Sequence, residues 1–215
     1  MINTSSHKNK DCEQLTDMAN TKLLAAFALL QVLSLHLHIH GVSAASSITH
    51  KPKKPGSCHI SGFLQGKAGK CNPAHGSDCC AAGHRYPQFK CSPPVLAKTP
   101  ATLTLNSFAA GGDGGGKSFC DNRFHPDSAM VVALSTGWLR LDGTRRCNRM
   151  IRINGNGRSV LAKVVDECDS VNGCDAEHNF EPPCPNNVVD GSPAVWKALG
   201  LKEEIGEFKV TWSDV

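Results

Sequence analysis

The cysteines restrict what this chain can fold into more than any other feature of its sequence. Of the 11 cysteines in 215 residues, Cys12 lies near the N-terminus and the others follow residue 57. The later ones are Cys58, Cys71, Cys79, Cys80, Cys91, Cys120, Cys147, Cys168, Cys174 and Cys184. Their even number and the lack of paired C-x-x-C spacings favour disulfides over zinc, so we expect five disulfides, no metal and no cofactor. The spacing leaves the pairing open, except that the adjacent Cys79 and Cys80 must bridge to two different segments.

An apolar run near the N-terminus predicts secretion. Residues 23–35 are long enough for the central part of a signal peptide and shorter than the roughly 20 apolar residues of a membrane span. Small residues follow at Ser43 and Ala44. We therefore expect residues 1–44 to be a cleaved signal peptide and the mature protein to be extracellular, with no membrane contact. A membrane anchor is the alternative. Cleavage would also remove Cys12 and leave an even number of cysteines.

The rest of the chain divides into three segments of different composition. Residues 45–57 form a basic, proline-containing leader, and residues 58–95 form a cysteine-rich module without periodic apolar residues. Residues 96–215 contain the patterns of regular structure and form the predicted second domain. The chain carries 23 Lys and Arg against 19 Asp and Glu, a balance too even for nucleic-acid binding to be its main function.

Short strands and one late helix dominate the second domain. Strand patterns cover residues 102–108, 129–135, 149–154, 159–166 and 207–213, and Asn-Gly pairs at 154–157 predict a tight hairpin turn. A helix is expected between Ser192 as N-cap and Gly200 as C-cap, with Pro193 in its first turn. This many short strands in about 115 residues suggests a small closed barrel.

Four segments of the second domain resemble the kiwellin, or ripening-related, family of plants. They read VVDEC at residues 164–168, CPNNVVD at 184–190, AVWKALG at 194–200 and VTWSD at 210–214. The resemblance implies a mainly β fold, a six-stranded double-psi β-barrel with one short helix, preceded by a disulfide-rich module. It also implies a non-catalytic apoplastic protein of plant defence or ripening. Some members of the family bind and inhibit secreted enzymes of pathogens, so a secreted pathogen protein is the expected partner.

Two aspartates, Asp166 and Asp190, lie at the strand ends of these segments and are candidate site residues. Double-psi barrels that cleave glycans need two carboxylates across a groove, which makes a glycan-cleaving enzyme one alternative. Two valines, however, precede Asp190, and neither can donate a hydrogen bond to a sugar. We therefore expect the two aspartates to bind or to support the fold rather than to catalyse.

A run of arginines predicts a binding patch for an acidic partner surface. Arg140, Arg145, Arg146 and Arg149 carry it, and Arg152 and Arg158 continue it. Arginine suits this role because its planar guanidinium pairs with carboxylates through two parallel hydrogen bonds. A solvated hairpin face without a partner is the alternative.

Two further motifs suggest other ligands. Residues 111–118 match the glycine-rich phosphate loop, but that loop requires a helix to begin at its Lys-Ser, and no helical periodicity follows Ser118. We interpret the segment as a glycine loop beside the barrel mouth. In the cysteine-rich module, His84, Tyr86 and Phe89 could stack on sugar rings, so a wall polysaccharide is the alternative partner.

Overall fold

The computed structural model describes residues 57–74 and 78–215. The predicted signal peptide lies outside these residues, as does the basic leader apart from Ser57. Within the described ranges no helix is both long and apolar enough to cross a bilayer.

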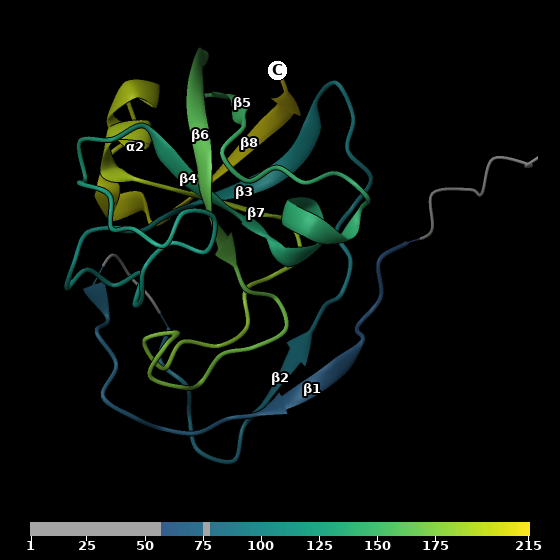
Figure 1. Cartoon of the computed structure of the whole chain (residues 1–215), viewed down its shortest axis with the longest axis vertical. Helices are drawn as coiled ribbons and strands as arrows, with labels where there is room; N and C mark the ends of the chain where they lie inside the picture. Colours follow the sequence, from purple (N-terminus) through teal and green to yellow (C-terminus); the bar gives the residue numbers. More distant parts are fainter. Residues whose placement is uncertain (1–56, 75–77) are drawn as a thin grey trace, which may run out of the picture. The chain divides into compact units, whose positions relative to one another are not determined.

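A closed six-stranded barrel is the centre of the structure (Figure 1). Its strands, in chain order, are β3 (Thr99–Leu105), β4 (Val131–Ser135), β5 (Met150–Gly155), β6 (Arg158–Cys168), β7 (Val188–Gly191) and β8 (Glu207–Asp214). Around the barrel they follow the order β3-β7-β4-β6-β5-β8. The pairs β3–β7 and β4–β6 are parallel and the others antiparallel. The fold is the double-psi barrel that the family resemblance implied.

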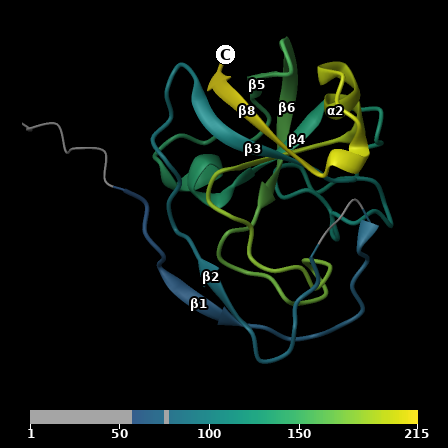
Figure 2. The same ribbon diagram turned by 180° about the vertical axis from the view of Figure 1, so that it is seen from behind.

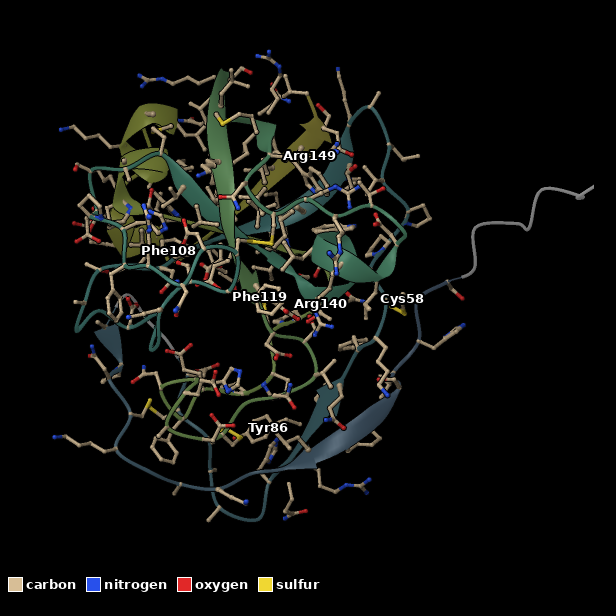
Figure 3. The ribbon with its side chains drawn as sticks, in the orientation of Figure 1. Cys58, Tyr86, Phe108, Phe119, Arg140 and Arg149 are labelled. Atoms are coloured by element: carbon tan, nitrogen blue, oxygen red, sulfur yellow. A yellow bond between two sulfur atoms is a disulfide. The ribbon has the colours of Figure 1, made fainter. Side chains whose placement is uncertain are left out.

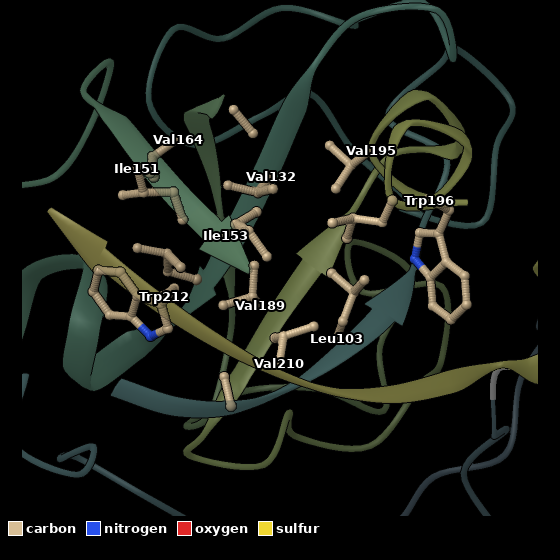
Figure 4. Packing of buried hydrophobic residues seen from close by; sticks show 14 of the residues in the cluster. Leu103, Val132, Ile151, Ile153, Val164, Val189, Val195, Trp196, Val210 and Trp212 are labelled. Atoms are coloured by element: carbon tan, nitrogen blue, oxygen red, sulfur yellow. The ribbon is translucent and has the colours of Figure 1, made fainter. Parts of the chain in front are cut away.

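Side chains that point inward from alternate positions of each strand fill the interior of the barrel (Figure 4). Ile151 and Ile153 of β5 face inward, and Trp212 of β8 packs edge-on against Trp138 at a centroid distance of 5.1 Å. Trp196 joins the same core from helix α2 and donates its Nε1–H to the carbonyl of Thr104. Burial of these large side chains is the main favourable term for the barrel.

Helix α2 (Pro193–Leu199) has the predicted caps. The Ser192 side chain accepts from the N–H of Val195, and Gly200 ends the helix at φ 70°, a left-handed conformation that favours glycine. Two strands differ from their predicted limits. Strand β3, predicted at residues 102–108, ends at Leu105, and strand β6, predicted at residues 159–166, continues to Cys168. Sequence analysis missed β7, the π-helix at Gly137–Leu141 and the 3-10 turn at Glu203–Ile205.

The cysteine-rich module contains one small hairpin, β1 (Gly62–Gln65) with β2 (Arg85–Gln88) (Figure 2). Among its described residues only Cys80 is a buried hydrophobic residue, which agrees with the lack of apolar periodicity. The ten cysteines form the five expected bridges, and the pairs are Cys58–Cys91, Cys71–Cys79, Cys80–Cys174, Cys120–Cys147 and Cys168–Cys184. The neighbours Cys79 and Cys80 thus bridge to different segments, as predicted.

The module is joined to the long loop that follows β6. Besides the Cys80–Cys174 bridge, the N–H of Cys80 donates to the carbonyl of Phe180, and the N–H of Phe89 donates to that of Ser170. The Cys168–Cys184 bridge closes the base of this loop. The loop therefore depends on the module on one side and on the barrel on the other.

Candidate functional site: an acidic cleft and its rim

A narrow cleft lies between the barrel and the loop that follows β6. It is lined by the carboxyl groups of Asp113, Asp166, Glu167, Asp169, Glu177, Glu181 and Asp190, together with His178, Asn106 and Asn172. Its volume is about 100 Å³, whereas sites for small-molecule ligands have roughly 300–1,000 Å³. Asp166 and Asp190, the two aspartates singled out in the sequence, both line it. No group of three or more His, Cys, Asp or Glu side chains in the described ranges could hold a metal ion.

Asp166 is held by the backbone of two segments. Its Oδ1 accepts from the N–H of Phe119 and from the N–H of Glu167, each at 2.8 Å. Burial raises the pKa of Asp166 to about 6, although these hydrogen bonds favour the charged form. The carboxyl group thus fixes the loop at Phe119 to the end of β6.

Asp190 lies at the end of β7, beside β3. The Thr104 hydroxyl donates to its Oδ1 at 2.5 Å. Burial, together with the negative charges of Asp113, Glu181 and Asp166, raises the pKa of Asp190 to about 7 against the effect of the hydrogen bond from Thr104. The proton that Asp190 then carries below neutral pH relieves the repulsion among the acids of the cleft.

His178 is the positive group of the cleft, and sequence analysis missed it. Its Nδ1 lies 2.7 Å from Asp175 Oδ1, and its Nε2 lies 3.5 Å from Asp169 Oδ2. The hydrogen bond to Asp169 raises the pKa of His178 to about 9, against the effect of burial. Burial would raise the pKa of Asp169, but hydrogen bonds from His178 and Asn172 hold it well below its usual range. These partners come together only through the turns of the loop, for which the sequence carries no periodic signal.

An exposed aromatic ring and a guanidinium form the rim of the cleft (Figure 3). The Arg140 Cζ lies 5.7 Å from the centre of the Phe119 ring, and the Phe119 residue is 58% exposed. Arg140 is fixed in turn by Glu167, which accepts from its Nε at 2.9 Å and its Nη2 at 3.0 Å. The largest cause that raises the pKa of Arg140 is this hydrogen bond. The Cys120–Cys147 bridge holds the loop next to Phe119.

The predicted arginine patch is divided by the structure. Arg145 and Arg149 are exposed on the loop that contains Cys147, and Figure 3 shows Arg149 well apart from Phe119 and Arg140. Arg146, by contrast, is only 2% exposed, and its assignment to the binding patch is wrong. Its guanidinium turns inward to Asp142, Asp214 and the carbonyl of Trp138. We define the rim face as Phe119 and Arg140, the two residues that the structure brings into contact.

The glycine-rich segment does not begin a helix, because turns and bends follow Ser118. Asp113 and Gly114 of this segment line the cleft, which places the glycine loop at the barrel mouth. Asp113 is buried, and its Oδ1 accepts from the N–H of Ser107 at 2.9 Å. The geometry that a phosphate loop requires is therefore missing here.

One pair of aromatic rings in the module is in contact. The rings of His84 and Tyr86 lie 4.6 Å apart, and the Tyr86 hydroxyl accepts from the N–H of Ala81. A side chain added at Gly66 would meet the Tyr86 ring at 2.8 Å, so that ring packs closely on the glycine. The contacts within the module thus occupy part of the surface that a sugar would need.

Comparisons with known proteins agree with the sequence motifs. A family model described as Kiwellin-1 matches residues 15–215. A ripening-related protein of Oryza sativa subsp. japonica is 72% identical over 214 residues, which cover 92% of this chain and 99% of the rice protein. Kiwellin of Actinidia chinensis var. chinensis is 54% identical over 146 residues, 67% of each chain. Among solved structures, an apo expansin of Clavibacter michiganensis has a TM-score of 0.39 at 21% identity, over 55% of this chain and 50% of the expansin.

Proposed function

The chain belongs to the kiwellin family of plant ripening-related proteins, and from this premise we propose that it is a secreted, non-catalytic protein that binds a partner protein through the rim face. The partner we propose is a protein secreted by a plant pathogen, the class that the family resemblance implies.

The preorganised pair of Phe119 and Arg140 is the observation that carries this proposal. Aromatic and arginine side chains supply most of the energy at protein interfaces, above all when they are already rigid before binding. Phe119 offers an exposed ring, and its position is fixed through Asp166, Arg140 and the Cys120–Cys147 bridge. The rim face would therefore lose little conformational entropy when a partner binds to it.

The geometry of the cleft supports a function without catalysis. An acid–base pair that cleaves a glycan must reach the glycosidic bond from two sides. The cleft, at about 100 Å³, is smaller than the roughly 300–1,000 Å³ of typical ligand sites. In addition, Asp166 Oδ1 already accepts two backbone N–H groups. These features favour a structural role for the carboxyl groups.

A second candidate function is the cleavage of glycans, and one observation favours it. Burial raises the pKa of Asp166 to about 6 and that of Asp190 to about 7, values that suit a general acid. Removal of a general acid or base lowers a rate by about 10²–10⁴-fold. The Asp166→Asn and Asp190→Asn variants therefore separate the two candidates.

The test immobilises the secreted mature protein and exposes it to apoplastic fluid from infected and uninfected plants. We expect the wild type and both Asn variants to capture the same protein from infected fluid. We also expect none of the three to release reducing sugar from chitin, cellulose or xylan, or to bind insoluble chitin or cellulose. Sugar release by the wild type that both Asn variants lose would replace this proposal with the enzyme. Retention on chitin or cellulose without protein capture would replace it with a wall-binding module.

A further inference from the structure

One side of the barrel wall, formed by β5, β6 and β8, is basic and contains no residue of the rim face. The residues of β5, β6 and β8 alternate, so that Ile151, Ile153, Ala162, Val164, Val210 and Trp212 are buried inside the barrel. The alternate residues point outward, and in the central part they are Met150, Arg152, Leu161, Lys163, Lys209, Thr211 and Ser213, with Glu207 on the same side at the start of β8. We call these outward residues the basic wall.

The pairing of the strands brings the basic residues of this wall together. Met150 pairs with Lys163, and Arg152 pairs with Leu161 on one side and with Ser213 on the other. Arg152 and Lys163 are thus diagonal neighbours, about 7–8 Å apart by the usual geometry of antiparallel strands. Lys209 lies farther along β8, four residues from the Ser213 that pairs with Arg152, and its Nζ donates to the Thr102 hydroxyl on β3.

Acidic groups are few on this side of the described barrel. Asp214, opposite Ile151 on β8, accepts from the Arg146 guanidinium through both of its carboxylate oxygens. Glu207 is the first residue of β8 and precedes Lys209 by two residues. Around Arg152 and Lys163 the outward residues of these strands therefore carry no carboxylate, whereas the outward Glu207 lies near Lys209 on β8.

The chemistry of the wall differs from that of a protein interface. The large hydrophobic residues at its surface are Met150 and Leu161, each only 40% exposed. The exposed aromatic residues of the described chain are Phe63, Phe119 and Phe124, and none of them lies on β5, β6 or β8. A barrel wall with long cationic side chains and hydroxyl groups suits an extended polyanion that binds by charge and hydrogen bonds.

We propose that the basic wall binds a linear polyuronate, an acidic polysaccharide of the plant cell wall with a carboxylate on each sugar ring. This inference rests on the secretion that the proposed function assumes, but it involves other residues and another ligand. Carboxylates along the polymer pair with Arg152, Lys163 and Lys209, and sugar hydroxyls exchange hydrogen bonds with Ser213. Such binding would hold the protein in the wall while the rim face stays free for its partner.

The test measures retention of the purified mature protein on immobilised polygalacturonate, without any protein partner present. The wall variant is Arg152→Glu combined with Lys209→Glu. The matched control is Lys197→Glu combined with Lys202→Glu, which changes the net charge equally on exposed residues of α2 and the turn after it. Circular dichroism and a melting curve establish that both variants are folded.

We expect the wall variant to bind at least about tenfold more weakly than the wild type, and the control to bind within about twofold of it. Added salt should weaken wild-type binding steeply, because exposed charges are screened within about 3 Å at 1 M salt. Equal weakening in both variants would mean attraction by net charge alone and would overturn the proposal. Equal binding to fully methyl-esterified polymer, or to polyglutamate, would overturn the choice of a polyuronate. Capture of the pathogen protein by the wall variant stays unchanged, so this result is independent of the test of the proposed function.

Discussion

At the scale of the residue, Arg146 and its neighbour Arg145 have opposite roles. The Arg146 guanidinium lies 2.8 Å from Asp214 Oδ1 and 2.7 Å from Asp142 Oδ2, and its Cζ lies 5.3 Å from the centre of the Trp212 ring. Arg145, one position earlier, is exposed. The sequence predicts positive charge over this segment but cannot show which arginine faces inward, because a loop has no period that orders its side chains.

Substitution of these two arginines should have very different effects on stability. Arg146→Ala removes a buried guanidinium and leaves the Trp138 carbonyl without its donor, so we expect a loss of about 2–4 kcal/mol in the free energy of unfolding. The partner Asp214 is 46% exposed and can be hydrated, which keeps the loss below that of a fully buried pair. Arg145→Ala should change stability by less than about 0.5 kcal/mol. Urea unfolding of both variants with intact disulfides measures this, and similar losses would refute the inward role of Arg146.

The two cleft aspartates should make the folded state more stable in mild acid than at neutral pH. Folding raises the pKa of Asp190 to about 7 and that of Asp166 to about 6, so the folded state holds protons that the unfolded chain has released. The free energy of unfolding therefore falls as the pH rises from about 4 to 7, by several kcal/mol in total, since each unit of pKa shift contributes about 1.4 kcal/mol. The raised pKa of His178, about 9, contributes stability that is complete below about 6.5 and is lost as the pH rises through 9.

The Asp190→Asn variant separates the contribution of Asp190 to the pH dependence of stability from that of His178. The amide resembles the protonated acid and can still accept from the Thr104 hydroxyl, so this variant should lose part of the difference between pH 4.5 and pH 7. Denaturant unfolding at the two pH values measures it, with the exposed substitution Asp78→Asn as the control. An unchanged difference in the Asp190→Asn variant would show that its carboxyl group is ionised at both pH values.

At the scale of the element, the regular patterns were predictable and the irregular connections were not. Alternation of apolar residues indicated β5, β6 and β8, and capping residues fixed helix α2 at both ends. Strand β7 has only four residues, too few for a period to emerge. The cleft was predictable only in part. Asp166 lies in a strand that alternation reveals, and Asp190 stood out through the family motif, since its own strand β7 was not predicted. His178 and the pair of Phe119 and Arg140 depend on loops fixed by disulfides and by long-range hydrogen bonds.

The disulfide between the module and the loop should stabilise the module more than the barrel. The Cys80–Cys174 bridge spans 94 residues, and such bridges contribute about 2–4 kcal/mol. In a Cys80→Ser, Cys174→Ser variant, amide hydrogen exchange should speed up in β1 and β2 well before it does in the barrel strands, because the module has almost no buried apolar residues of its own.

The local bridge Cys71–Cys79, with a separation of 8 residues, provides the matched control. Its removal should leave the exchange of β1 and β2 close to that of the wild type. If removal of Cys80–Cys174 accelerated exchange equally in the barrel and the module, the two would unfold as one unit and the dependence of the module on this bridge would be disproved.

At the scale of the whole molecule, the barrel presents two surfaces of different chemistry. The rim face combines an exposed ring with the fixed guanidinium of Arg140, whereas the basic wall combines cations with hydroxyl groups on the outside of the barrel. The first suits a protein partner and the second an extended polyanion. The acidic cleft lies next to the rim face and keeps it rigid through Asp166 and Glu167.

The affinity of the rim-face variant for the captured pathogen protein tests the proposed function most directly. Isothermal titration would compare the wild type with Phe119→Ala and with Phe63→Ala, a control that removes an equally large ring, 49% exposed, on β1. We predict that Phe119→Ala weakens binding by about 2 kcal/mol or more, roughly 30-fold, and that Phe63→Ala leaves it within about twofold. Equal affinities for the wild type and the Phe119→Ala variant would contradict the proposed role of the rim face.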